Sequence, residues 1–268
     1  MTSETDISSE KVSEFYDQGT DVLVKMMGDN LHAGYWDEGD DSTTMEGAAE
    51  RLTREMMRRL APRAGQRILD VGCGVGGPAL TLAAAEQVNI VGITISRYQV
   101  HLATERIAGA GLSDRVRFEE VDVMSLPYED GAFDGAWFVE SLLHVPDKVL
   151  ALREVARVLH PGGRVVVGDG FRRETADVPH EWLLSIPTLE GYRDLVEEAG
   201  LVSLEVEDIT AHTMMPPSVK KEMLARTLAN REGMTAMLGG DDAVFEKEVE
   251  RLENLTELPY VIVTARRD

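Results

Sequence analysis

A glycine-rich run at residues 69–77 carries the sharpest chemical signal in the sequence. It places Gly72, Gly74 and Gly77 at the G-x-G-x-x-G spacing of a nucleotide-binding turn. Glycines at such a turn let a ligand approach the backbone without a clash from a Cβ atom. Asp70 stands two residues before the first glycine, where its charge would repel a pyrophosphate but attract an ammonium group. A tight turn without any ligand is the alternative explanation.

The residues after this run argue against a dinucleotide. A nicotinamide cofactor needs a carboxylate about twenty positions further on to bind its ribose. This sequence has Thr94, Ile95 and Ser96 in that region and no carboxylate. The glycine run therefore indicates a cofactor that carries an amino-acid portion, and a dehydrogenase is disfavoured.

Two polar residues follow strands of the predicted sheet and are candidates for proton transfer. His144 follows the strand predicted at 135–139, and Asp169 ends the strand predicted at 164–168. Histidine suits a general base because its pKa lies near neutrality, and a hydroxyl acceptor needs such a base. The alternatives are a helix-capping role for His144 and a loop-stabilising role for Asp169. The scattered histidines and the single Cys73 show no metal-ligand spacing, so no metal is expected.

Strands and helices alternate around these residues. Apolar runs predict strands at 68–71, 88–95, 116–121, 135–139 and 164–168. Helical patterns lie between them at 79–85, 98–109 and 148–159, and a helix at 188–199 and strands at 202–209 and 260–266 follow. This alternation predicts an α/β fold, a doubly wound Rossmann-like sheet with helices on both faces.

Helical segments are added to this core at two places. Thr43 and Glu46 form a capping box before a helix predicted at 45–60. Two amphipathic helices are predicted in an insertion before the last strand, one beginning near Pro217 and one at 242–255. We therefore expect one domain over residues 1–268, made of an N-terminal helical lid (1–62), a cofactor-binding core (63–210), a cap (211–257) and the last strand (258–268).

Composition restricts the partners. The net charge of −21 disfavours a nucleic-acid substrate and an anionic membrane surface. The first residues lack the features of a signal peptide, and no apolar run reaches the roughly 18 residues of a membrane span. We expect a cytoplasmic protein that acts on a small molecule, and the sequence leaves open whether it forms a homo-oligomer.

Three motifs together resemble class I S-adenosylmethionine (SAM)-dependent methyltransferases. They are Asp70-x-Gly72-x-Gly74, the segment 122–134 (DVMSLPYEDGAFD) and the turn at 159–163 (LHPGG). The resemblance covers about residues 66–170. Further segments at 30–36, 92–100 and 140–147 resemble a subgroup that contains actinobacterial natural-product enzymes such as rebeccamycin sugar O-methyltransferases, with relatives acting on tocopherols, sterols and cyclopropane lipids.

The resemblance implies a seven-stranded sheet whose last strand is antiparallel, with SAM as methyl donor and S-adenosylhomocysteine as product. Near the glycine run, Asp70, Gly72 and Gly74 would frame the methionine portion. Around the second and third strands, the resemblance assigns cofactor contacts to Thr94, Ile95, Ser96, Gln99, Asp122 and Val123. Asp122 would accept a hydrogen bond from the adenine amino group. Gln99 as a solvated helix residue and Asp122 as a turn former are the alternatives.

Other cofactor contacts would come from Glu140 or Leu142 through the backbone, and from Tyr16 and Trp36, which would fold over the cofactor. Ordinary packing is the alternative for both aromatic residues. The resemblance also places a catalytic histidine near His144, although the subgroup has two adjacent histidines where this chain has Leu143 and His144. Asp169 would orient His144 or the acceptor.

The favoured function is O-methylation of a natural product with His144 as base. The acceptor would lie under a lid at 171–187 and against methionines of the insertion, namely Met214, Met215, Met223, Met234 and Met237. Methylation of nitrogen, of an alkene or of an activated carbon stays open. So do a cyclase that binds SAM without transferring its methyl group and a binding module without catalysis.

Overall fold

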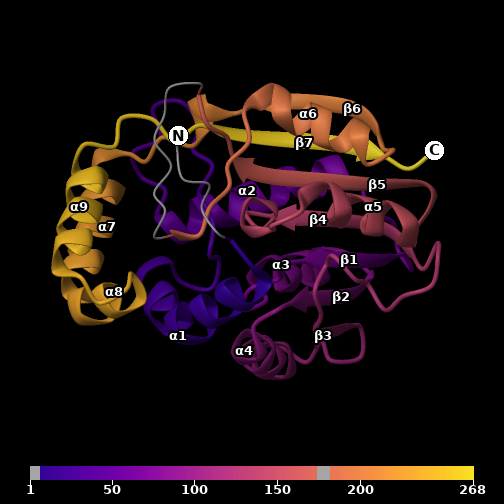
Figure 1. Ribbon diagram of the computed structural model, residues 1–268, viewed down its shortest axis with the longest axis horizontal. Coiled ribbons are helices and arrows are strands. Elements are labelled where there is room, and N and C mark those ends of the chain that lie inside the picture. The colour runs from indigo at the N-terminus through magenta and orange to yellow at the C-terminus, as the bar shows by residue number, and fades with distance from the viewer. Residues whose placement is uncertain (1–6, 174–181) are drawn as a thin grey trace.

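A seven-stranded sheet forms the centre of the computed structural model, which describes residues 7–173 and 182–268 (Figure 1). The strands are β1 (Arg67–Val71), β2 (Asn89–Thr94), β3 (Val116–Glu120), β4 (Phe133–Val139), β5 (Leu159–Gly170), β6 (Val202–Asp208) and β7 (Tyr260–Arg266). Their order is β3-β2-β1-β4-β5-β7-β6, and β7 runs antiparallel to both of its neighbours. This arrangement confirms the predicted fold class.

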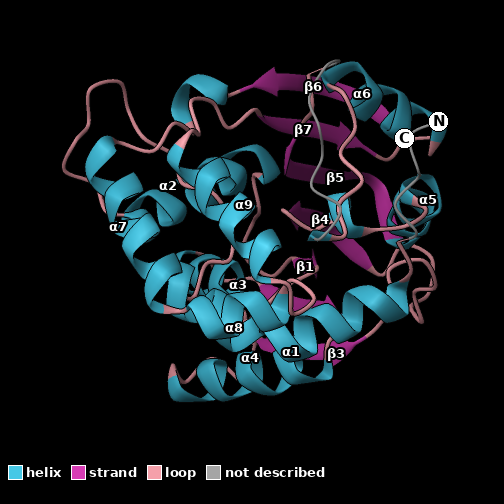
Figure 2. Ribbon diagram, turned by 60° about the vertical axis from the view of Figure 1, so that its left-hand side comes forward, coloured by secondary structure: helices cyan, strands magenta, loops and turns pink. Residues whose placement is uncertain are grey.

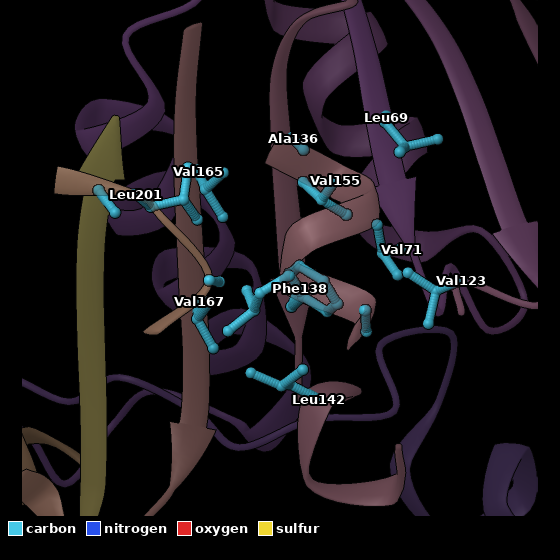
Figure 3. Packing of buried hydrophobic residues seen from close by; sticks show 14 of the residues in the cluster. Leu69, Val71, Val123, Ala136, Phe138, Leu142, Val155, Val165, Val167 and Leu201 are labelled. Carbon is cyan, nitrogen blue, oxygen red and sulfur yellow. The ribbon is translucent and has the colours of Figure 1, made fainter. Parts of the chain in front are cut away.

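Helices cover both faces of the sheet because side chains of each buried strand alternate between the faces. Leu69 and Val71 of β1 point to the face covered by α5 (Lys148–Val158) and α6 (Leu189–Glu198), where Figure 3 shows them near Phe138 and Val155. Ile68 points to the opposite face, which α2 (Met45–Leu60), α3 (Gly77–Ala85) and α4 (Arg97–Gly109) cover. The sheet therefore holds the carboxyl ends of β1, β2 and β4 rigidly side by side.

Two details of the predicted elements need correction. β5 begins at Leu159 rather than at residue 164, because Leu159 pairs with Phe133 beyond an irregularity in the register. The hydroxyl that caps α2 belongs to Thr44, which accepts the Gly47 amide at 3.2 Å. Thr43 instead donates to Asp40 at 2.5 Å, so it is not available as the cap.

In the predicted N-terminal helical lid (1–62) the sequence pattern gives no helix before residue 45, and the structure has one there, α1 (Ser9–Met27). Its buried face includes Val12, Phe15 and Leu23, but Gly19 and Thr20 are buried on the same face and interrupt the apolar period. The Ser8 side chain accepts the Lys11 amide and begins the helix. A polar and small-residue interruption of this kind hides a helix from pattern analysis.

The insertion forms three helices instead of the predicted two: α7 (Pro217–Ala229), α8 (Arg231–Met237) and α9 (Asp242–Glu253). The missed helix, α8, has seven residues, which is too short for a periodic pattern. Figure 2 shows the three helices as a layer beside α1. Trp36, Met223, Met234 and Phe245 are buried together where these helices meet.

No helix in residues 7–173 or 182–268 is long and apolar enough to cross a membrane.

Candidate active site

A cavity of about 870 Å³ lies at the carboxyl ends of β1, β2 and β4. β1 stands between β2 and β4, so this is the point where the strand order reverses and where open α/β sheets bind ligands. Its lining combines the glycine run with the ends of neighbouring strands. The cavity therefore has the place of a nucleotide-type site.

The glycine run forms one wall of this cavity. Gly72 has a φ of +70°, and a Cβ atom there would lie 2.3 Å from Cβ of Ser141. Ser141 is itself fixed, because its hydroxyl donates to the Val71 carbonyl at 2.6 Å. Gly74 also adopts a positive φ, of +51°. Both glycines are thus required by conformation, and they bring backbone to the cavity surface.

The end of β2 forms a second wall through Thr94 and Ile95. The Thr94 hydroxyl donates to the Gln99 side chain at 2.7 Å, and the Gln99 amide donates to Thr20 of α1 at 3.3 Å. Thr94 and Gln99 both line the cavity, as predicted for cofactor contacts. Ser96 differs, since it is fully buried, caps α4 and donates to Asp17 outside the cavity wall.

Asp122 and Val123 form the wall at the end of β3. One carboxylate oxygen of Asp122 accepts the Met124 amide at 2.8 Å, and the other accepts the Ser9 hydroxyl of α1 at 2.7 Å. Asp122 therefore shapes its own turn, as the alternative explanation held, and also fastens α1 over the cavity.

Asp70 lies behind this cavity rather than on its wall. The side chain is 1% exposed, and it faces Trp137 of β4, its register partner. One carboxyl oxygen has no hydrogen-bond partner among the described residues. Burial raises the pKa of Asp70 to about 7. This placement departs from the predicted contact with the methionine portion, because the motif spacing did not show which face of β1 the side chain takes.

A second cavity, of about 1820 Å³, lies between the core and the cap. Trp36 lines this cavity and not the first; it is 3% exposed, and its indole nitrogen donates to the Thr43 carbonyl. The prediction that Trp36 folds over the cofactor is corrected accordingly. The methionines that line the cavity are Met26, Met27, Met45, Met215, Met223 and Met234. Of the five predicted methionines, Met214 and Met237 lie outside the lining.

The predicted lid at 171–187 is only partly described. Residues 174–181 lie outside the described residues. Phe171 and Trp182, on either side of them, line the second cavity. The Trp182 indole donates to Glu248 of α9 at 3.2 Å and packs edge-on against Phe15 of α1.

The two cavities meet at Tyr16, Leu31, Glu140 and His144, which line both. Nδ1 of His144 lies 3.2 Å from the Leu183 carbonyl, which can only accept, so Nδ1 carries the proton. Nε2 is then an acceptor, and the Tyr16 hydroxyl lies 2.8 Å from it. Burial lowers the pKa of His144 to about 4. At neutral pH His144 is therefore an uncharged base at the junction.

Asp169 does not orient His144. Its side chain is fully buried, lines neither cavity and has no hydrogen-bond partner for either carboxyl oxygen among the described residues. Burial, followed by the nearby Glu140, raises the pKa of Asp169 well above its usual value. The predicted orienting role thus falls to the Leu183 carbonyl, a backbone group that side-chain patterns cannot reveal.

Sequence reasoning also missed the face of α1 that closes the first cavity. The Ser13 hydroxyl donates to the Ile95 carbonyl at 2.8 Å, and Asp17 accepts the Ser96 hydroxyl at 2.5 Å. With Ser9 on Asp122, these contacts recur every four residues, which is one helix face. The i, i+4, i+8 spacing of small polar residues is the signal that would have found them, once the helix was recognised.

Comparison with known proteins agrees with this geometry. A family model described as "Methyltransferase domain" matches residues 69–167. A 27-O-demethylrifamycin SV methyltransferase from Amycolatopsis mediterranei (strain S699) is 39% identical over 273 residues, covering 96% of this chain and 97% of that protein. This chain belongs to the class I SAM-dependent methyltransferases.

Two other similar proteins bear on the function of the site. The methyltransferase GfsG of Streptomyces halstedii is 39% identical over 78% of each chain. The crystal structure of the [4+2]-cyclase SpnF matches with a TM-score of 0.86 and 35% identity, covering 97% of each chain. A protein that resembles this chain over nearly its whole length is therefore named for a cyclisation.

Proposed function

We propose that this enzyme transfers the methyl group of SAM to a hydroxyl group of a large, mostly apolar natural product. The observation that carries the proposal is the junction of the two cavities, where His144 stands as an uncharged base. The first cavity has the place of a nucleotide site, and the second is the larger of the two and offers more room to an acceptor. Methyl transfer requires the methyl group of the donor and the acceptor oxygen to lie in line. The two cavities allow this arrangement because they adjoin at the residues that line both.

The residues of the first cavity fit SAM. Backbone at Gly72 and Gly74 would hold the methionine portion, because both glycines line this cavity in positive-φ conformations that expose the backbone. Val123 offers an apolar surface to the adenine ring, and Asp122 offers carboxylate oxygens near it. The bound donor supplies an activated methyl group.

The chain's own residues supply orientation and a proton acceptor. As the acceptor oxygen forms its bond to the methyl carbon, the carbon–sulfur bond breaks, sulfur keeps the electron pair, and Nε2 of His144 takes the hydroxyl proton. The Leu183 carbonyl holds the imidazole in the required tautomer. The Tyr16 hydroxyl, which donates to Nε2 here, has to move aside for the acceptor. α1 covers both partners and excludes water.

The relatives support oxygen as the methylated atom. The rifamycin relative is named for methylation of a 27-O-demethyl compound, and it matches nearly the whole of this chain. A cyclase is the second candidate, since the SpnF structure is similar over almost its full length. In that case SAM would bind without losing its methyl group.

We expect His144→Asn to keep the affinity for S-adenosylhomocysteine while methyl transfer falls by about 10²–10⁴-fold, the usual worth of a general base. Calorimetric titration measures the first quantity. Mass spectrometry of product formed from 27-O-demethylrifamycin SV, or from another hydroxylated macrocycle that the enzyme accepts, measures the second. His101→Asn is the matched control, because His101 is exposed on α4. If His144→Asn retained turnover, His144 would not be the general base.

A further inference from the structure

Glu140 is the carboxylate at the junction of the cavities. It follows β4 directly and has a φ of +50°, a left-handed conformation that residues other than glycine rarely adopt. Two hydrogen bonds hold it there: its amide donates to the Gly168 carbonyl at 2.8 Å, and its carboxylate accepts the Ala33 amide at 2.5 Å. Glu140 thus has a strained backbone, and its two hydrogen bonds fix its carboxyl group at the junction of the two cavities.

The surroundings of this carboxyl group contain no cation that balances it within the described part of the chain. Tyr260 approaches the Glu140 carboxyl group from β7. The charge of Glu140 in turn raises the pKa of several buried groups on other elements. Those groups are Tyr16 of α1, Asp169 of β5, Tyr192 of α6 and Tyr260 of β7. The buried cation Lys148 of α5 interacts electrostatically with Asp169, and its ammonium group donates to the Leu143 and Val145 carbonyls. Of the four residues that line both cavities, Glu140 alone carries a carboxyl group, and none is a Lys or Arg.

We propose that the Glu140 carboxylate makes the site prefer the positively charged methyl donor to its uncharged product, S-adenosylhomocysteine. The inference rests on the proposed function, which places the methyl group at the junction. Opposite charges attract more strongly in a buried site than in water. When methyl transfer removes the charge from sulfur, that attraction ends, so Glu140 favours release of the product.

The ionisation of Glu140 fits this role. Burial raises the pKa of Glu140 to about 7, so the group sits near its midpoint at neutral pH. An arriving cation lowers the pKa of a neighbouring carboxyl and draws it into the ionised form. Binding of a cationic ligand then releases a proton from Glu140, and binding of the uncharged product does not.

The test compares sinefungin, which carries a protonated amine where SAM carries its methyl-sulfonium, with S-adenosylhomocysteine. Calorimetric titration of the full chain at pH 7.5 or so gives both affinities. We expect Glu140→Gln to weaken sinefungin by roughly 10–100-fold and S-adenosylhomocysteine by less than about threefold. Glu246→Gln on α9, at an exposed ion pair with Arg231, is the matched control and should change neither affinity.

Each outcome separates the inference from the proposed function. Equal losses for both ligands, or an unchanged affinity for sinefungin, would overturn the role of Glu140. Binding of neither ligand by the wild-type protein would instead remove the proposed function. Proton release gives an independent readout on the wild-type protein. The heat of sinefungin binding should depend on the buffer, and this dependence should be smaller in Glu140→Gln; equal dependence in both would also count against the inference.

Discussion

Burial decides which ionisable side chains of the site carry charge. The pKa of His144 and that of the buried His32 are both lowered to about 4 by loss of solvent. The same cause raises the pKa of Asp70 and of Glu140 to about 7. At neutral pH the imidazoles are therefore uncharged, and the titrating groups are the carboxyls. The ordinary pKa values of these residue types suggest the opposite, a titrating histidine and fully ionised carboxylates. The sequence could not show the difference, because burial is a property of the fold.

Asp70 offers a test at the scale of a single residue. Its pKa is raised in the folded state, so its contribution to stability is present at low pH and is lost as the pH rises toward 7. Asn cannot ionise and escapes that loss. We expect the free energy of unfolding of Asp70→Asn, relative to wild type, to grow by on the order of 1 kcal/mol per pH unit between pH 5 and 7.

Urea unfolding at several pH values measures this difference. Asp114→Asn, at an exposed position, is the control and should show a difference that does not vary with pH. A constant difference for Asp70→Asn as well would mean that the Asp70 carboxyl is solvated or paired in the folded protein.

Among the elements, α1 connects the two halves of the site. Its first half lines the first cavity through Ser9, Val12 and Tyr16. Its second half lines the second cavity through Leu23 and other residues. The helix also packs closely on the cap. Val22 of α1 lies against Gly233 of α8, where an added Cβ atom would come within 2.7 Å of a Val22 methyl group. Both cavities thus depend on one helix for part of their walls.

This contact predicts opposite effects for two similar substitutions. Gly233→Ala should destabilise the protein by about 1–3 kcal/mol, because the stiff Val22 side chain cannot easily give way. Gly109→Ala, at the exposed end of α4 with nothing within 4 Å of the added Cβ, should be neutral or stabilising by up to about 1 kcal/mol. Thermal unfolding compares the two, and equal effects would show that α1 and α8 are not in tight contact.

Pattern and turn chemistry predicted the core elements, but not the directions of individual side chains. The strand at 260–266 coincides with β7, because a nearly continuous run of apolar residues, buried on both faces of the sheet, marks it. The helix α1 was missed because Gly19 and Thr20 break its apolar face. The motifs located the cavity wall, including Gly72 and Asp122, since turn residues are fixed by local geometry. They misplaced Trp36 and Asp169, whose positions depend on packing between distant segments.

For the whole molecule, the arrangement amounts to a seven-stranded sheet with the first cavity at its edge and a helical cap beside the second cavity. On the cap side, the second cavity is lined by methionines, which adapt to irregular apolar shapes. Polar groups are concentrated at the junction and at the rim, where Arg173 pairs with Glu257 and Arg251 with Glu248. This distribution suits a bulky apolar acceptor that presents one hydroxyl to His144.

In the proposed function, the methyl group is transferred to an acceptor oxygen at the junction of the two cavities. The most direct measurement supplies SAM with a deuterated methyl group and a panel of hydroxylated macrocycles, and locates the label in the product by mass spectrometry and NMR. We expect a labelled methyl group on oxygen, formed by wild type and lost in His144→Asn. A label on carbon, or a cyclised product without label, would contradict it.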